Sequence, residues 1–309
     1  MTQQRYDDLQ PLVSAAVVLG VDGSRGSERA LRWAAELASQ RDRELRIVHG
    51  MDLAATSRTQ GTVDWEALPV VEAAQARGRS VLRRAEQTAQ GIAPTLRITT
   101  RLSASPSAQL LIEHSAGAYA TVLGARGGTR FLRRMGRTLL AVTAYGRGIV
   151  VVVRADADAD TAIRNSGPVV VGVDASPVSE AAIAAAFMEA SERRTDLVAV
   201  HVWSDRDFGR FAGRDNLLLS DTDLDEAERA ILAERLAGWQ ERYPDVPVGR
   251  RVYPDAPAEL LETWSKSAQL VVVGNRGREG LRGLLFGSTC NALVRHSHCP
   301  VMVAHPADR

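Results

Sequence analysis

Disulfide frameworks, membrane spans and export signals are all missing from this sequence. Only two cysteines, Cys290 and Cys299, occur in 309 residues, which is too few for a disulfide framework and predicts two reduced thiols in a core. No apolar run approaches about eighteen residues, so no segment is predicted to span a bilayer. Residues 1–8 are polar and acidic, without the basic start and apolar middle of a signal peptide, so we predict a cytoplasmic protein.

An excess of charge of either sign is missing as well. The 38 Lys and Arg residues face 37 Asp and Glu residues, so no net field attracts nucleic acid or an anionic membrane. We therefore expect no membrane partner and disfavour nucleic acid as a partner. The 45% apolar content of this long chain is enough to bury two cores.

The chain does contain an internal repeat with a period of about 150 residues. The matching segments are, pair by pair, 17–24 and 169–176, 48–49 and 200–201, and 122–127 and 272–277. Because period and order persist over the whole chain, we interpret the repeat as a tandem duplication. It predicts a first domain at 1–154, a polar and acidic linker at 155–167, and a second domain at 168–309.

Each repeat alternates short β-branched runs with helical patterns. In the first repeat we predict strands at 15–21, 45–49, 96–102, 121–123 and 149–153, helices at 28–38, 72–90, 106–115 and from 138, and a loop at 52–66. The same order returns from Val169 to Ala304. Continuous apolar strands alternating with helices predict an α/β fold with two five-stranded parallel sheets, each covered by helices on both faces.

Chemistry-bearing residues follow the predicted strands of both repeats. Asp22, Asp174, His49 and His201 all lie at predicted strand carboxyl ends, where parallel sheets bind ligands. The turn at 274–277 follows the apolar run at 270–273, and its glycines allow close approach of a ligand. Gly287-Ser288 then opens a helical run at 289–295, whose free N–H groups attract an anion. This arrangement predicts a phosphate cradle.

The turn and the Gly-Ser pair, written G-x2-G-x9-G-[ST], resemble the nucleotide-binding signature of the ATP-binding universal stress proteins. The similar segments are 171–176, 200–203, 257–261, 271–277 and 299–303. The resemblance covers about residues 15–154 and 168–305 and matches the tandem members of that family. It implies ATP bound without rapid turnover, a stress-linked regulatory role, and pairing of the last strands between the two domains.

The resemblance also implies roles for individual residues. Asp174 would contact adenine, Val202 would pack on the base or hydrogen-bond it, and the glycine turn with Gly287-Ser288 would hold ribose and phosphates. Asp205, at the rim of the second strand, is either a ribose ligand or a solvated loop acid. The predicted ligand contacts are Gly172, Asp174, Val202, Asp205, Gly274, Asn275, Arg276, Gly277, Arg278, Gly280, Gly287, Ser288 and Thr289 in the second repeat, and Gly20, Asp22, Gly124, Arg126, Gly127, Gly136 and Arg137 in the first.

The first repeat departs from the signature, because its spacer is one residue shorter and Arg137 stands where the second repeat has Ser288. Three interpretations remain open. Arginines of the basic stretch at 126–137 replace the hydroxyl as phosphate ligands, the loop has lost its nucleotide, or the basic patch docks an acidic partner or nucleic acid.

Several other features favour a binding protein over an enzyme. His296, His298 and Cys299 have metal-ligand types, but strand alternation separates the last two, so we predict no metal site. Ser24 and Ser176 fit helix caps, and His49 and His201 fit structural hydrogen bonds as well as ligand contacts.

No P-loop signature occurs, and no lysine follows the glycine turn. We predict an ATP-binding regulatory protein without catalytic residues that forms a homodimer, with a regulatory protein as a candidate partner; the alternative is a slow ATPase or phosphotransferase.

Overall fold

The structure, a computed structural model, describes residues 15–53, 68–125, 136–154, 163–174, 177–203, 221–254, 256–276 and 287–306. The chain divides into two compact units, Met1–Arg154 and Ala155–Arg309. Their boundary lies at the predicted end of the first domain. The predicted linker and the predicted pairing of the last strands between the units stay predictions.

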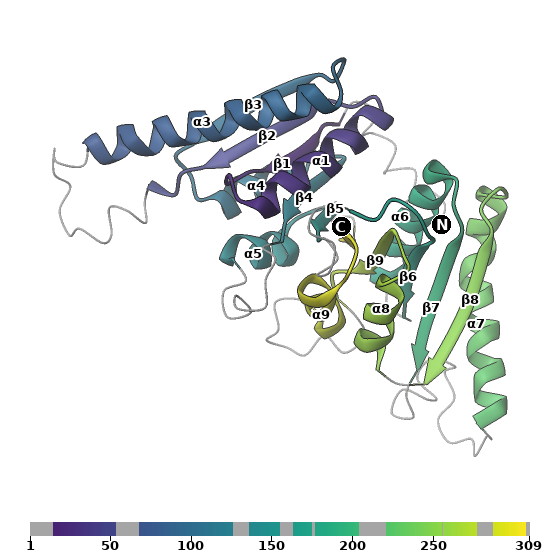
Figure 1. The fold of residues 1–309 in the computed structure, drawn as a ribbon. Coiled ribbons are helices and arrows are strands. Elements are labelled where there is room, and N and C mark those ends of the chain that lie inside the picture. Colours follow the sequence, from purple (N-terminus) through teal and green to yellow (C-terminus); the bar gives the residue numbers. More distant parts are fainter. Residues whose placement is uncertain are drawn as a thin grey trace. The chain divides into compact units, whose positions relative to one another are not determined.

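The first unit alternates strands and helices as expected. Its described elements are β1 (Val17–Gly20), α1 (Arg25–Gln40), β2 (Leu45–Gly50), α3 (Leu68–Ile92), β3 (Ile98–Ser103), α4 (Ser107–Ser115), β4 (Ala120–Gly124), α5 (Arg137–Tyr145) and β5 (Ile149–Val153). The strands form a parallel sheet in the order β3-β2-β1-β4-β5. Helix α3 lies along β2 and β3 (Figure 1).

The second unit repeats this arrangement. Its described elements are β6 (Val169–Val173), α6 (Pro177–Arg193), β7 (Leu197–Trp203), α7 (Asp221–Arg242), β8 (Val248–Pro254), α8 (Pro257–Ser265), β9 (Leu270–Gly274), α9 (Ser288–His296) and β10 (Val301–Ala304). Its parallel strands follow the order β10-β9-β6-β7-β8. The predicted α/β class with two tandem units of alternating strands and helices is therefore confirmed.

Apolar side chains bury both faces of each sheet. In the first unit α4 and α5 cover one face, where strand and helix side chains form one buried cluster that includes Val18, Val48, Leu111, Leu123 and Val142. Helices α1 and α3 contact each other and the same strands from the opposite face. This two-layer cover explains why the strands are apolar without polar alternation, as the sequence indicated.

The second unit has an aromatic contact between two of its helices. Phe187 of α6 stacks on Trp239 and Tyr243 of α7, with ring centroids 6.2 and 5.8 Å apart. Offset aromatic pairs of this kind contribute about 0.5–1.5 kcal/mol beyond the area that they bury. The stack therefore ties α6 firmly to α7.

Two helices extend beyond their predicted bounds. Helix α1 begins at Arg25, three residues early, because Ser24 caps it and accepts a hydrogen bond from the Ser27 amide at 3.3 Å. Helix α3 spans Leu68–Ile92 and passes through Gly91, where a helix end was expected. A single helical glycine costs only about 0.5–1 kcal/mol relative to alanine, which the packing of a long helix overrides.

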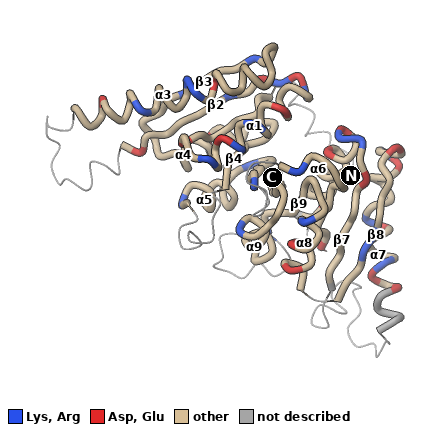
Figure 2. Tube along the Cα trace, in the orientation of Figure 1, with Lys and Arg blue, Asp and Glu red and all other residues tan. Residues whose placement is uncertain are grey.

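Charges of both signs are interspersed along the helices of the described part (Figure 2). This agrees with the balanced composition and fits well-solvated helix surfaces. Within the described segments, no helix is both long enough and apolar enough to cross a bilayer.

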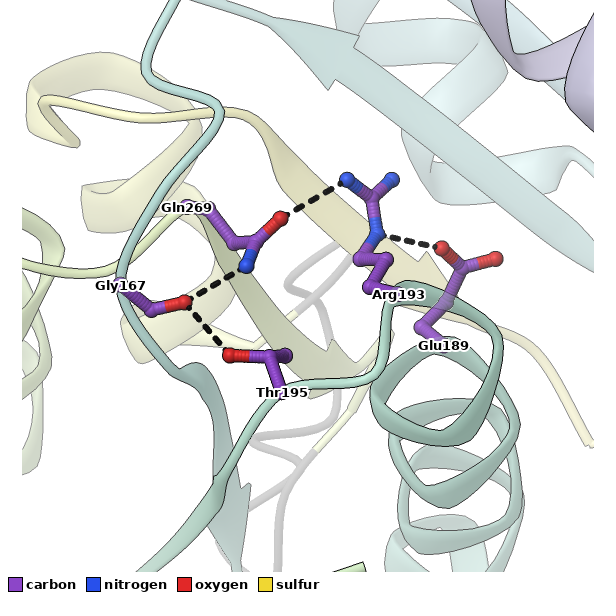
Figure 3. A network of polar contacts seen from close by, with 5 residues as sticks. All are labelled: Gly167, Glu189, Arg193, Thr195 and Gln269. Carbon is purple, nitrogen blue, oxygen red and sulfur yellow. Dashed lines mark hydrogen bonds and ion pairs between the residues drawn. The ribbon is translucent and has the colours of Figure 1, made fainter.

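A polar network closes the end of the second sheet opposite to its carboxyl edge (Figure 3). Arg193, at the end of α6, donates from Nε to Glu189 at 2.8 Å and from Nη1 to Oε1 of Gln269 at 3.1 Å. Gln269 and Thr195 both donate to the carbonyl oxygen of Gly167, at 2.6 and 3.0 Å. The network thus fixes the chain where it enters β6.

Gly167 is the residue that the network holds, and its backbone needs glycine. Its φ is +101°, and a Cβ there would lie 2.1 Å from the carbonyl oxygen of Ser267. Both the conformation and the space exclude a side chain.

We expect Gln269→Ala to destabilise the second unit by about 1–3 kcal/mol, because the buried Gln269 amide joins Arg193 to the Gly167 carbonyl and both hydrogen bonds are lost. Urea unfolding of protein labelled with 5-fluorotryptophan would report it through Trp264, with Trp33 reporting the first unit. Gln240→Ala is the control, since its contact with Arg250 at 2.6 Å is exposed, and it should stay within about 0.5 kcal/mol of the parent. Equal effects of the two variants would contradict the role of the network.

Candidate functional site

The carboxyl ends of two neighbouring strands define the candidate edge in each unit. In the first unit β1 lies between β2 and β4, so the strand order reverses between β1 and β4. In the second unit the same reversal falls between β6 and β9. Open α/β sheets bind ligands at such switch points, outside the carboxyl ends of the strands.

In the second unit, Asp174 directly follows β6 at this edge and is held in place by a serine. The hydroxyl of Ser179 donates to Oδ1 of Asp174 at 2.6 Å, and the hydroxyl oxygen of Ser179 accepts from the Asp174 backbone amide at 2.8 Å. Ser179 is buried and Asp174 is half-buried. A carboxylate fixed in this way is a preorganised acceptor for an amino group of a ligand.

The end of β9 is tied to the start of α9. The amide of Asn275 donates to the Ala304 carbonyl, and the Gly287 amide donates to the Asn275 carbonyl, both at 3.0 Å. Gly287 is the N-cap of α9 and supplies no side-chain cap, while Ser288 at the first helical position is exposed. The start of α9 is therefore held next to the end of β9, and the free amides of a helix start stabilise an anion.

Asn275 also makes a buried side-chain contact. Its Nδ2 lies 3.0 Å from Nδ1 of His305, and both residues are buried. Within the described residues, Oδ1 of Asn275 has no hydrogen-bond partner although it is buried. The side-chain amide of Asn275 thus anchors the start of the glycine turn to His305. Its Oδ1 remains available as an acceptor for a neighbouring donor.

The first unit places its equivalent residues differently. Asp22 is exposed, and its Oδ1 accepts from the amide of Ser24 at 2.9 Å, within its own turn. Gly136 is the N-cap of α5 without a side-chain cap, and Arg137 is exposed in the first turn. A guanidinium therefore stands beside the helix N-terminus that would receive an anion.

Three of the predicted glycines have packing reasons that need no ligand. A Cβ at Gly124 would lie 2.0 Å from the carbonyl oxygen of Gly26 in α1. At Gly20 and Gly172 it would lie 2.8 Å from a methyl carbon of Leu111 or Leu261, in the helix on the other face. The strand glycines therefore allow helices to approach the sheet closely.

The structure describes only part of the predicted site. Val202 lies in β7, Gly274 ends β9, and Thr289 lies in the first turn of α9. Arg276 is the last described residue of the glycine turn. Six predicted contacts lie outside the described residues, namely Arg126, Gly127, Asp205, Gly277, Arg278 and Gly280. Sequence reasoning missed Ser179 and His305, because a serine five residues after an aspartate and a histidine after the last strand form no recognisable motif.

The two cysteines are inert core residues. Both are buried and free, and burial raises the pKa of each thiol to about 12. No group of three or more His, Cys, Asp or Glu that could hold a metal occurs among the described residues.

We therefore expect both thiols to resist labelling in the folded protein. At about pH 8 a thiol with a pKa of about 12 is roughly one ten-thousandth thiolate, against about a quarter for an exposed cysteine. A chromogenic disulfide reagent should find two reactive thiols only after denaturation. The thiols of the unfolded chain ionise at a lower pH than the buried thiols of the folded protein. The free energy of unfolding therefore decreases as pH rises above about 8.5. Rapid native labelling of either thiol would refute the assignment.

Comparison with known proteins fits both the fold and the motifs. The universal stress protein family matches residues 15–154 and 166–305. A universal stress protein of Mycolicibacterium smegmatis is 39% identical over 313 residues, which cover 96% of this chain and 99% of the relative. One from Mycobacterium tuberculosis is also 39% identical, over 302 residues covering 96% and 98%. The crystal structure of a universal stress protein from Archaeoglobus fulgidus has a TM-score of 0.69 at 17% identity, covering 96% and 98%. The chain belongs to the universal stress protein family, with two tandem domains.

Proposed function

We propose that the second unit binds ATP at the carboxyl edge of β6 and β9 and holds it as a structural or signalling ligand of a stress-response regulator. The observation that carries this proposal is the pairing of two complementary groups at one switch point. Asp174, fixed by Ser179, offers an acceptor to an adenine amino group. The start of α9, tied to β9 through Gly287, offers amides to phosphate oxygens.

A regulatory role is supported over catalysis by the chemistry of the turn. An NTPase normally supplies both a cation that neutralises phosphate and a group that positions the nucleophile. Arg276 and Arg278 are cations near the turn, but no lysine follows it in the sequence. A slow ATPase or phosphotransferase is the second candidate function, because these arginines would neutralise charge on a transferred phosphoryl group.

Titration calorimetry of the full chain with ATP, ADP, AMP and GTP tests the proposal. We expect one tight ATP site per chain in the second unit, with GTP weaker, and ATP as the main nucleotide extracted from the purified protein. Turnover should lie far below the enzyme median of about 10 s⁻¹. Hydrolysis near that median that disappears in Gly277→Val would favour the enzyme. Absence of any adenine nucleotide binding would refute the proposal.

The first unit has its own test, because Arg137 distinguishes the open interpretations. If Arg137→Ser weakens ATP binding there, the guanidinium is a phosphate ligand. If Arg137→Ser with one added spacer residue creates binding, the loop has lost its nucleotide. We also expect a homodimer, since isologous dimers are the commonest assembly, and light scattering of the pure protein would measure it.

A further inference from the structure

An arginine of the first helix reaches the carboxyl edge of the first unit. Arg29 lies in the second turn of α1, and its Nη2 donates to the carbonyl oxygen of Ala125 at 3.5 Å. Ala125 directly follows β4, within the predicted turn at 124–127. Side chains of a helix tilt toward its N-terminus, and α1 begins at this edge, shortly after β1. The guanidinium of Arg29 is therefore directed back to the end of β4.

The charge of this guanidinium has little compensation. Arg29 is half-buried, and its Nε is buried without a hydrogen-bond partner. The 3.5 Å contact with Ala125 lies at the outer limit of a hydrogen bond. Within the described part of the chain, Arg29 forms no ion pair with a carboxylate. Partial removal of a cation from water without a counter-charge costs free energy, so an anion at this place would be stabilised.

The neighbouring charged groups do not supply the counter-charge. Glu28, next to Arg29 on α1, is exposed, and Asp22 after β1 accepts a hydrogen bond within its own turn. Strand β5 pairs with β4, and the residue that follows β5 is Arg154, another cation. In the sequence, the segment 126–135 that follows Ala125 contains four arginines and no Asp or Glu. This segment can therefore add only positive charge.

The second unit has no arginine at this position. Counted from the aspartates that follow β1 and β6, Ala181 of α6 takes the place of Arg29. The second unit keeps the hydroxyl of Ser288 at the start of α9, whereas the first unit has Arg137 at the start of α5. The arginine on the first helix thus occurs in the unit that lacks the hydroxyl of the signature.

We propose that Arg29 binds a phosphate-type oxyanion at the end of β4, which gives the first unit an anion site built on α1. A guanidinium presents its N–H donors in a planar fork that pairs with two phosphate oxygens at once. The positive local charge favours a multiply charged anion over a singly charged carboxylate. The oxyanion is free phosphate or the phosphate group of a nucleotide, and the site does not rest on ATP binding by the second unit.

Stability in phosphate measures this site in the full chain, because an anion that binds only the folded first unit stabilises that unit. Urea unfolding of protein labelled with 5-fluorotryptophan would be followed at Trp33, with phosphate replacing chloride at constant ionic strength. At a phosphate concentration about ten times the dissociation constant, the folding equilibrium constant of the first unit should rise about tenfold. Acetate at the same ionic strength should change it less than about twofold.

Arg29→Gln separates an anion ligand from a structural hydrogen-bond donor. Glutamine keeps an N–H donor but removes the charge, so the phosphate effect at Trp33 should fall below about twofold. Without phosphate, Arg29→Gln should fold at least as well as the wild type, because it removes a cation that lacks a counter-charge. Arg29→Lys keeps the charge without the planar fork and should retain part of the phosphate effect.

Arg25→Gln is the matched control, because Arg25 is exposed on the same helix and its replacement removes the same charge. It should keep the tenfold phosphate effect. Equal phosphate effects in wild type and Arg29→Gln would overturn the proposal, and so would an equal loss of the effect in both glutamine variants. A loss of stability in Arg29→Gln that is the same with and without phosphate would show a structural donor and would also overturn it.

The same measurement with ATP and with adenosine separates the two sources of the oxyanion. If ATP stabilises the first unit through Arg29 and adenosine does not, the bound group is a nucleotide phosphate. If phosphate acts through Arg29 and ATP does not, the ligand is free phosphate; both results support the oxyanion site. The Trp264 transition reports ATP binding by the second unit, so a failure of the proposed function is seen separately from a failure of this site.

Discussion

Replacing Gly124 with alanine is expected to destabilise the first unit by more than about 3 kcal/mol, a large share of the roughly 5–15 kcal/mol that stabilises a domain. The new Cβ would lie 2.0 Å from the Gly26 carbonyl oxygen and 2.7 Å from the Ser27 amide. Both are backbone atoms of α1, which cannot rotate aside as a side chain can. Urea unfolding followed at Trp33 would show the loss, while the Trp264 signal of the second unit should keep its midpoint.

Gly91→Ala is the matched control for this prediction. Gly91 lies in α3 with no atom near its missing Cβ, so alanine there should stabilise the first unit by about 0.5–1 kcal/mol. An unchanged midpoint for Gly124→Ala would mean that α1 shifts without cost, and that the glycine is present for a ligand alone.

The fold was largely predictable because its signals are local. β-branched runs such as 169–173 and 270–274 alternate with helical patterns, and each was found as a strand close to its expected bounds. Parallel strands bring their carboxyl ends to one edge, so the placement of Asp174 followed from the strand assignment. The glycine turn and the helix starting at Ser288 were likewise visible as a motif.

The chemistry around Asp174 was not predictable from spacing. Both units have an aspartate two residues before a serine, yet Asp22 accepts from its own turn whereas Asp174 accepts from Ser179. Sequence spacing alone does not show which donors each carboxylate contacts. A contact between Nε2 of His201 and Oε2 of Glu228, at 3.0 Å, was hidden for a related reason, because it depends on how α7 packs on the sheet.

The same difference predicts unequal responses to mutation at the two aspartates. Asp174→Ala should weaken ATP binding by the second unit about ten- to hundredfold, since a hydrogen bond to a charged group is worth about 1.5–3 kcal/mol. The half-buried carboxylate is fixed by Ser179 before the ligand arrives, so its removal loses a preorganised acceptor.

Asp22→Ala is the matched variant, and it should leave this site unchanged. The exposed Asp22 carboxylate is occupied by the Ser24 amide, so its loss should mainly loosen the turn before α1. Calorimetry of both full-length variants with ATP and with GTP would measure the effects. Asp174→Ala should also reduce the ratio of ATP affinity to GTP affinity. If Asp174→Ala binds ATP like the wild type, the base lies elsewhere. If Asp22→Ala alone weakens binding, the tight site belongs to the first unit.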